Sequence, residues 1–308
     1  MTGAVLLALA PVALLVGLGH ALRRGGVLAE SFWPQAERLA YYVLLPALFV
    51  HGLATARLDG VPVALLAAAL VLPTLAVAAL LVAARPFLGV GGPAFTSVFQ
   101  GGVRFNNYVG VTAAAGLLGA DGIALAAVAN AALVPTANVL CVLVFAGLGP
   151  GRASVSGILR GIASNPLVLG CLGGILLQAT GWGVPPVVEP ALRALGQAAL
   201  PVGLLCVGAA LDFTTAGAWV RPLLAACAAR FVAVPVLAAL ACWGLGLEGP
   251  ALVAALLFTG LPTASSAYVM ARQCGGDAPL MAGIVAVQTV LAGLTLPLTL
   301  AALLALLR

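Results

Sequence analysis

The sequence predicts an all-α membrane protein with ten transmembrane helices, arranged as two inverted repeats of five helices. The first observation is composition, because 63% of the 308 residues are hydrophobic, only 7% are charged and the mean hydropathy is +1.21. Soluble domains carry about 25% charged residues. The second is length, because several apolar runs reach the ~20 residues that cross ~30 Å of hydrocarbon. The third is a set of motifs in the first half that recurs in the second.

Ten apolar segments are long enough to cross a bilayer. Each is expected to be a helix, because an open strand in lipid leaves its backbone groups without hydrogen-bond partners. The segments cover residues 3–22, 34–55, 61–83, 92–118, 122–148, 157–180, 186–211, 220–243, 250–273 and 279–305. Residues 149–156 form the only plausible linker, so the chain divides into a first repeat, 1–148, and a second repeat, 157–308. No soluble domain is expected.

The net charge of +5 comes from arginine alone, and the arginines are scattered near the ends of the apolar segments. That distribution is typical of topology signals and not of a nucleic-acid-binding surface. Arg23 and Arg24 follow the first apolar run, which excludes a cleavable signal peptide and places the N-terminus outside. The cytoplasmic loops then hold eight arginines and the outer side three, which favours both termini outside. The eight are Arg23, Arg24, Arg38, Arg85, Arg152, Arg160, Arg221 and Arg272, and the three are Arg57, Arg193 and Arg308.

The two halves repeat each other at an offset of about 155 residues. The matching pairs are LPALFVHGLATARLD with LPVGLLCVGAALD, GPAFTSVFQGG with GPALVAALLFTG, NNYV with SSAYV, and Asp121 with Asp277. An odd number of spans in each repeat means that the second copy inserts upside down relative to the first. Inverted repeats are typical of alternating-access transporters, which hold their substrate where interrupted helices meet near the midplane.

Two spans carry signals that interrupt a helix at matching repeat positions. The stretch Gly101–Asn107 places a glycine pair before Arg104, and the stretch Gly260–Ser266 contains Pro262, which removes a backbone donor. Freed backbone groups, helix N-termini and a guanidinium all favour an anion, and the guanidinium fork suits a carboxylate. The expected substrate-binding residues are Arg104, Asn106, Asn107, Tyr108, Pro262, Thr263, Ser265 and Ser266. The expected supporting residues are Gly101, Gly102, Gly260, Asn130, Gln288 and Arg230.

Several of these residues allow a second interpretation. Arg104 could extend to an interface if its span is shifted by a turn, and the serines and threonines could bond their own helix. Arg230 could support the interruptions from behind or pair with a helix end. Asn130 and Gln288 could line the site or join helices by hydrogen bonds. Tyr41 and Tyr42 are expected to be interface anchors.

All eight acidic residues are expected at or near span ends, so the site would contain a cation and no carboxylate. The membrane potential drives a monovalent anion outward by ~2.3 kcal/mol per 100 mV, so export needs no coupling ion. No Cys-x-x-Cys motif or Cys/His pairing occurs among the six cysteines. Neither a metal site, a disulfide framework nor a cofactor is therefore expected.

Four stretches resemble the auxin efflux carrier family, whose bacterial members include malonate and other organic-acid carriers. They are VRFNNYVG from Val103, SNPLVLGCLGGIL from Ser164, LPVGLLCVGAALD from Leu200 and LPTASSAYVMARQCGGDAPLMAGIVAVQT from Leu261. The resemblance implies an elevator-type homodimer in the bacterial inner membrane. Its scaffold would be spans 1, 2, 6 and 7, and its moving unit spans 3–5 and 8–10.

The resemblance also assigns roles to single residues. It makes Asn106 the asparagine that holds the substrate carboxylate and Pro262 the proline of the second interruption. This chain has Val111 and Thr112 where many relatives have a proline. With Arg104, that departure favours a small mono- or dicarboxylate over the plant hormone.

Two other functions stay open. A symporter of the related bile-acid type would import an anion with sodium or protons, and would need a cation cage of carbonyls and hydroxyls around Thr263–Ser266. An intramembrane hydrolase would use Ser265 or Ser266 as a nucleophile, but it needs a base, and no His or Lys lies in the apolar segments beside these serines.

Overall fold

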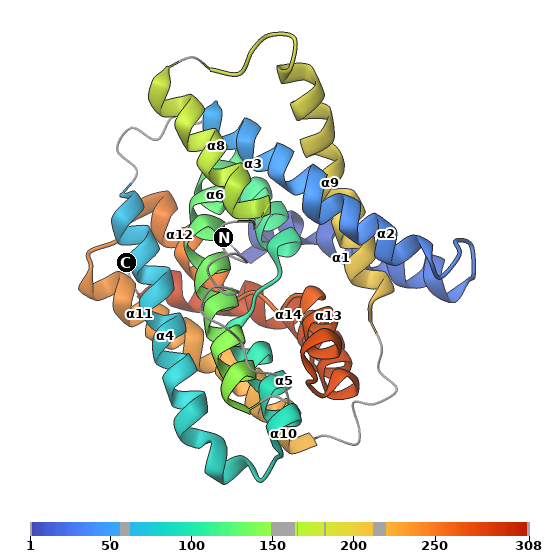
Figure 1. The fold of residues 1–308 in the computed structure, drawn as a ribbon. Helices are drawn as coiled ribbons and strands as arrows, with labels where there is room; N and C mark the ends of the chain where they lie inside the picture. The colour runs from blue at the N-terminus through green and yellow to red at the C-terminus, as the bar shows by residue number, and fades with distance from the viewer. Residues whose placement is uncertain are drawn as a thin grey trace.

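The computed structural model describes residues 2–55, 62–148, 164, 166–181, 183–211 and 220–306. These residues form helices joined by short connections, with no strand among them (Figure 1). The predicted linker 149–156 lies outside the described residues, and so do Arg57, Arg152, Arg160 and Arg308. The boundary between the two predicted repeats therefore has no structural account.

The first group of helices comes from the beginning and the middle of the chain. It contains α1 (Thr2–Arg24), α2 (Phe32–Leu39), the π-helical η1 (Ala40–Leu44), α3 (Leu45–Ala54), α8 (Pro166–Thr180) and α9 (Glu189–Ala209). α1 packs on α9, and α3 packs on both α8 and α9. Glycine permits the closest of these approaches, since a Cβ atom at Gly208 would lie 1.9 Å from the carbonyl oxygen of Val16. Small residues at such crossings are typical of helix packing in membranes.

The second group is made up of the remaining helices. It contains α4 (Val63–Leu88), α5 (Gly92–Val103), α6 (Asn107–Leu148), α10 (Val220–Ala228), the π-helical η3 (Ala229–Ala233), α11 (Val234–Gly244), α12 (Gly249–Thr259), α13 (Ser266–Cys274) and α14 (Ala278–Leu306). α5 packs on α10 and α14, while α6 packs on α4 and α12. α6 also contacts α1, α3, α8 and α9, so it connects the second group to the first.

α6 is not one straight helix. Gly119 has φ 62° and ψ −137°, a conformation that glycine adopts without steric cost. A Cβ atom at Gly122 would lie 2.0 Å from the carbonyl oxygen of Ala114, so the helical parts on either side of Gly119 lie against each other. The chain therefore folds back at Gly119, between the predicted spans 92–118 and 122–148.

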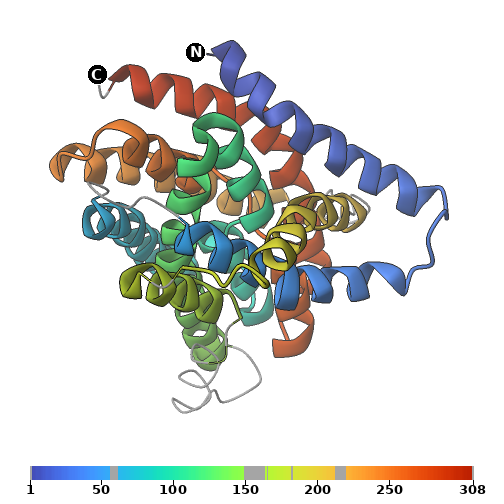
Figure 2. The same ribbon diagram turned by 90° about the horizontal axis from the view of Figure 1, so that it is seen from above.

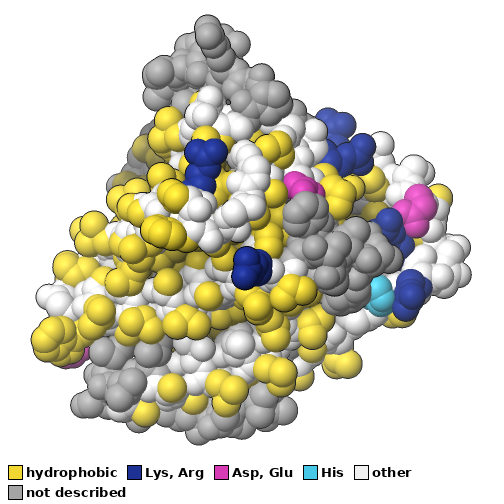
Figure 3. Space-filling model, turned by 90° about the horizontal axis from the view of Figure 1, so that it is seen from below, with side chains coloured by type: hydrophobic (Ala, Val, Ile, Leu, Met, Phe, Trp, Pro, Cys, Tyr) yellow, Lys and Arg dark blue, Asp and Glu magenta, His cyan; other side chains and the backbone are white. Residues whose placement is uncertain are grey.

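The surface of the molecule is apolar. Large hydrophobic side chains face outward on many helices, including Phe87, which is 89% exposed, and Trp243, which is 76% exposed. Figure 3 shows hydrophobic side chains over most of the described surface on one face, with few charged groups among them. An apolar surface of this extent fits hydrocarbon and not water.

Five helical stretches in the described part of the chain are long and apolar enough to cross a membrane. They are Val63–Leu88, Gly92–Leu148, Glu189–Ala209, Val220–Gly244 and Ala278–Ala302. The second of them includes the non-helical residues 104–106 and the fold at Gly119. α1 and α14 contact each other, and the beginning of α1 lies near the end of α14 (Figure 2).

Candidate functional site

Two connections between helices meet inside the molecule. α5 ends at Val103 and α6 begins at Asn107, while α12 ends at Thr259 and α13 begins at Ser266. The backbone N–H of Asn106 donates to the carbonyl oxygen of Pro262 at 2.8 Å. These two connections are called junction A (residues 104–106) and junction B (residues 260–265) below. A direct main-chain hydrogen bond thus joins junction A to junction B.

Gln288 on α14 strengthens this joint. Its Oε1 accepts from the backbone N–H of Thr263 at 3.0 Å, and its Nε2 donates to the carbonyl oxygen of Gly101 at 3.1 Å. The side chain is completely buried. Since a helix that stops inside an apolar core leaves backbone groups without partners, one amide satisfies a group from each side. Gln288 therefore supports the site and does not line it.

Arg230 in η3 holds the end of α12. It is only 2% exposed, and its Nε donates to the carbonyl oxygen of Leu261 while its Nη2 donates to that of Phe258 at 2.9 Å. The carbonyl end of a helix carries partial negative charge, which favours a cation. Both alternatives that the sequence left open for Arg230 are therefore met, because it pairs with a helix end and lies behind junction B.

Asn106 caps the start of α6. Its Oδ1 accepts from the backbone N–H groups of Tyr108 at 3.1 Å and Val109 at 3.2 Å. Its Nδ2 is buried without a hydrogen-bond partner in the described part of the protein. The hydroxyl of Tyr108 is likewise buried and has no hydrogen-bond partner there. Buried polar groups are rarely left unpaired. Both groups therefore have the capacity to bond a ligand or water.

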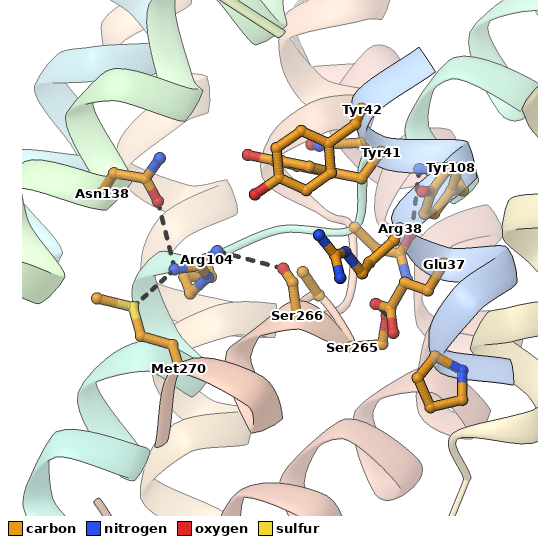
Figure 4. A pocket seen from close by; sticks show the side chains of 14 residues that line it. Glu37, Arg38, Tyr41, Tyr42, Arg104, Tyr108, Asn138, Ser265, Ser266 and Met270 are labelled. Atoms are coloured by element: carbon orange, nitrogen blue, oxygen red, sulfur yellow. Dashed lines mark hydrogen bonds between the residues drawn. The ribbon is translucent and has the colours of Figure 1, made fainter. Parts of the chain in front are cut away.

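Arg104 follows the end of α5 in an extended conformation. Its Nη1 donates to Oδ1 of Asn138 at 3.3 Å and to Sδ of Met270 at 3.0 Å, and its Nη2 donates to Oγ of Ser266 at 3.2 Å (Figure 4). All three partners are neutral, and no ion pair of Arg104 occurs among the described residues. The side chain is half-buried between helices.

A cavity of about 570 Å³ lies at this place. Six of the eight predicted binding residues line it, namely Arg104, Asn106, Asn107, Tyr108, Ser265 and Ser266. Pro262 and Thr263 do not line it. Both are buried, and the Thr263 hydroxyl donates to the carbonyl oxygen of Gln100 at 3.3 Å. Pro262 thus bonds junction A, and Thr263 bonds the last turns of α5 before it.

Among the supporting residues, the glycines act through close packing. A Cβ atom at Gly101 would lie 2.8 Å from Cγ2 of Ile284, and one at Gly102 would lie 2.7 Å from Cδ1 of Leu81. Gly260 ends α12. Asn130 is buried and donates to the carbonyl oxygen of Ala126 in its own helix at 2.8 Å. None of these four residues lines the cavity.

Four polar or charged lining residues on α2 and η1 were not predicted, namely Glu37, Arg38, Tyr41 and Tyr42. The hydroxyl of Ser265 donates to Oε1 of Glu37 at 3.1 Å. The expectation of a site without a carboxylate is therefore wrong, and the tyrosines line the cavity. The spacing of these residues at i, i+1, i+4 and i+5 places them on one helix face. This polar stripe is the signal that could have found them.

Residues 152–300 match the model of a family described as membrane transport protein. The second half of this chain is thus similar to the membrane transport protein family. The match confirms the resemblance to the auxin efflux carriers and covers junction B, Arg230 and Gln288. Glu37, Arg104 and Asn106 precede the matched range, so their roles rest on geometry. A comparison with curated proteins found no match. The match to this family model and the apolar helices together indicate an integral membrane transporter.

Proposed function

We propose that this protein is a carrier that moves small organic anions, mono- or dicarboxylates such as malonate, across the membrane by alternating access. The observation that carries the proposal is the guanidinium of Arg104. It lies in a cavity beside two connections between helices and has only neutral hydrogen-bond partners among the described residues. A cation in a site of low dielectric is costly unless an anion accompanies it. The substrate would supply that anion.

Two helix N-termini add to the attraction. α6 begins at Asn107 and α13 at Ser266, and both residues line the cavity. A helix N-terminus carries partial positive charge and free N–H groups, which favour an anion. The unpaired Nδ2 of Asn106 and hydroxyl of Tyr108 are further donors for a carboxylate.

The proposed architecture is ten transmembrane helices in two inverted repeats, 1–148 and 157–308, joined by residues 149–156. Spans 1, 2, 6 and 7 correspond to the first group of helices, whose glycine contacts make it a compact scaffold. Spans 3–5 and 8–10 correspond to the second group, which carries the cavity's Arg104 and would move as an elevator. The neighbouring ends of α1 and α14 agree with an even number of crossings. A homodimer in the bacterial inner membrane, with both termini outside, completes the proposal.

Export driven by the membrane potential is the favoured direction. With the N-terminus outside, Arg38 lies at the cytoplasmic end of its span, so a cavity that it lines opens toward the cytoplasm. An inside-negative potential moves a monovalent anion outward by ~2.3 kcal/mol per 100 mV. One observation favours a second candidate, symport with a proton or sodium ion, because Glu37 provides a carboxylate within the cavity.

Hydrolysis has less support. Glu37 accepts from the Ser265 hydroxyl and so is a base that the sequence did not lead us to expect. A hydrolase also needs its base oriented by a third group. Within the described residues the only hydrogen bond of the Glu37 carboxylate is the one from Ser265.

Transport in proteoliposomes tests the proposal. Purified protein would be reconstituted with labelled malonate or propionate inside, and an ionophore would set the potential. Efflux that exceeds that of protein-free vesicles and increases with an inside-negative potential is expected. Efflux that requires a proton or sodium gradient and ignores the potential would favour the symporter. No protein-dependent flux of either anion would contradict the proposal.

A further inference from the structure

The charged groups around the cavity do not cancel. Arg104, Arg38 and Glu37 are its charged lining residues. In Figure 4 the guanidinium groups of Arg104 and Arg38 point toward the cavity from opposite sides, with Ser266 between them. Two positive groups and one negative group leave one positive charge. A site of that charge is neutralised by a single carboxylate.

Adjacent residues connect the positive and negative ends of the cavity. Ser265 donates to Glu37, and the next residue, Ser266, accepts from Arg104. The Glu37 carboxylate and the Arg104 guanidinium therefore line one cavity and are linked through two neighbouring residues of the chain.

Glu37 forms no close ion pair among the described residues, and its carboxylate accepts a hydrogen bond from the neutral hydroxyl of Ser265. The other charged groups that line the two neighbouring cavities are Arg38 and Arg104 in the first and Arg23, Glu30 and Arg272 in the second. Arg23 and Glu30 form an ion pair at 3.0 Å and so largely cancel each other. The Glu37 carboxylate thus lines the cavity without a charged group within ion-pair distance among the described residues.

We propose that Glu37 determines substrate specificity by restricting the site to singly charged anions, so that the carrier prefers monocarboxylates to dicarboxylates. This inference rests on the proposed function and narrows its substrate class. The first carboxylate binds at Arg104. A second carboxylate on the same small molecule meets the carboxylate of Glu37, and like charges repel strongly where water is scarce. The Ser265 hydroxyl already donates to Glu37 and does not offset that repulsion.

Binding of two probes of equal chain length tests the inference. Purified wild-type protein and Glu37→Gln would be titrated calorimetrically with butyrate and with succinate, at a pH where both acids are fully ionised. The wild type is expected to bind butyrate on the order of tenfold more tightly than succinate, and Glu37→Gln to lose this preference because succinate gains. Glu30→Gln is the matched control, since Glu30 lines only the second cavity, and it should keep the wild-type preference.

Different outcomes would contradict the inference about Glu37 and the proposed anion carrier. An unchanged preference in Glu37→Gln, or a wild type that prefers succinate, would overturn the inference and leave an anion carrier. The comparison of butyrate with succinate on the wild type tests the expected preference even if Glu37→Gln does not fold. The free amino acid alanine is a third probe. If it bound to the wild type and not to Glu37→Gln, the inference would also be overturned, because Glu37 would then pair with the ammonium group of the ligand. Binding of neither acid to the wild type would contradict the proposed function itself.

Discussion

The backbone N–H of Asn106 donates to the carbonyl oxygen of Pro262 across 2.8 Å, although the two residues are far apart in the sequence. Each residue belongs to a connection between helices that leaves backbone groups unpaired within its own segment. The two connections bond each other, and the side chains of Gln288 and Arg230 bond further backbone groups beside them. Arg104 follows directly on this joint, so the proposed anion site depends on the buried amide of Gln288 and the guanidinium of Arg230, neither of which lines the cavity.

Gln288→Leu should destabilise the protein without changing the lining of the cavity. The substitution roughly keeps the volume of the side chain but leaves the N–H of Thr263 and the carbonyl of Gly101 without their hydrogen bonds to Gln288. Each unpaired buried group costs ~1–3 kcal/mol, so the loss should be about 2–4 kcal/mol. Thermal unfolding in detergent would measure it. Gln178→Leu, at a half-exposed position on α8, is the control and should unfold like the wild type; equal losses would argue against the bridging role.

Asn106→Asp should separate the capping role of Asn106 from its binding role. An aspartate keeps an oxygen for the N–H groups of Tyr108 and Val109, and a negative charge at a helix N-terminus is favourable. It removes the unpaired Nδ2 donor and adds charge against an anion. Stability should therefore be retained while anion affinity falls by roughly tenfold or more.

Calorimetric titration with butyrate would measure the affinity of Asn106→Asp. The same titration of Asn106→Ala and Asn130→Ala provides the comparison for Asn106. Asn130 donates within its own helix and does not line the cavity, so its replacement should affect affinity less. If Asn130→Ala weakened binding more than Asn106→Ala, the assignment of Asn106 to the substrate would be wrong.

Gly203→Ala should disfavour the conformation seen here. A Cβ atom at Gly203 on α9 would lie 2.0 Å from Cδ1 of Tyr108 on α6, at a contact between the proposed scaffold and moving unit. Overpacking of this kind costs ~1–3 kcal/mol, and a lower unfolding temperature should show it. Gly173→Ala is the control, because its Cβ atom would lie 3.8 Å from Val50, an ordinary contact. Equal unfolding temperatures for both variants would contradict the close contact.

The sequence was a sufficient guide where long apolar runs and helix-breaking residues determine the outcome. Composition predicted the helices, and Arg104, Asn106 and Ser266 were identified because polar groups are expensive in lipid. Gly101 and Gly102 were expected to loosen a helix, yet they permit close contact with Ile284 and Leu81. Which role a glycine has depends on its neighbours in space, and the sequence alone does not show them.

Glu37 was missed for a similar reason. A hydropathy pattern assigns a polar residue near the end of a span to the interface, whereas the cavity extends to α2 and brings Glu37 to Ser265. The contact joins residues from opposite ends of the chain. Only the three-dimensional arrangement shows that a carboxylate shares the cavity with Arg104.

The central claim is that Arg104 binds the carboxylate of the substrate. Calorimetric titration of purified Arg104→Ala with butyrate measures it most directly, beside Arg85→Ala as the control. Arg85 lies over the ring of Phe95 at 5.7 Å and does not line the cavity. The account predicts that Arg104→Ala folds but shows no measurable binding, while Arg85→Ala binds like the wild type. Wild-type affinity in Arg104→Ala would contradict it.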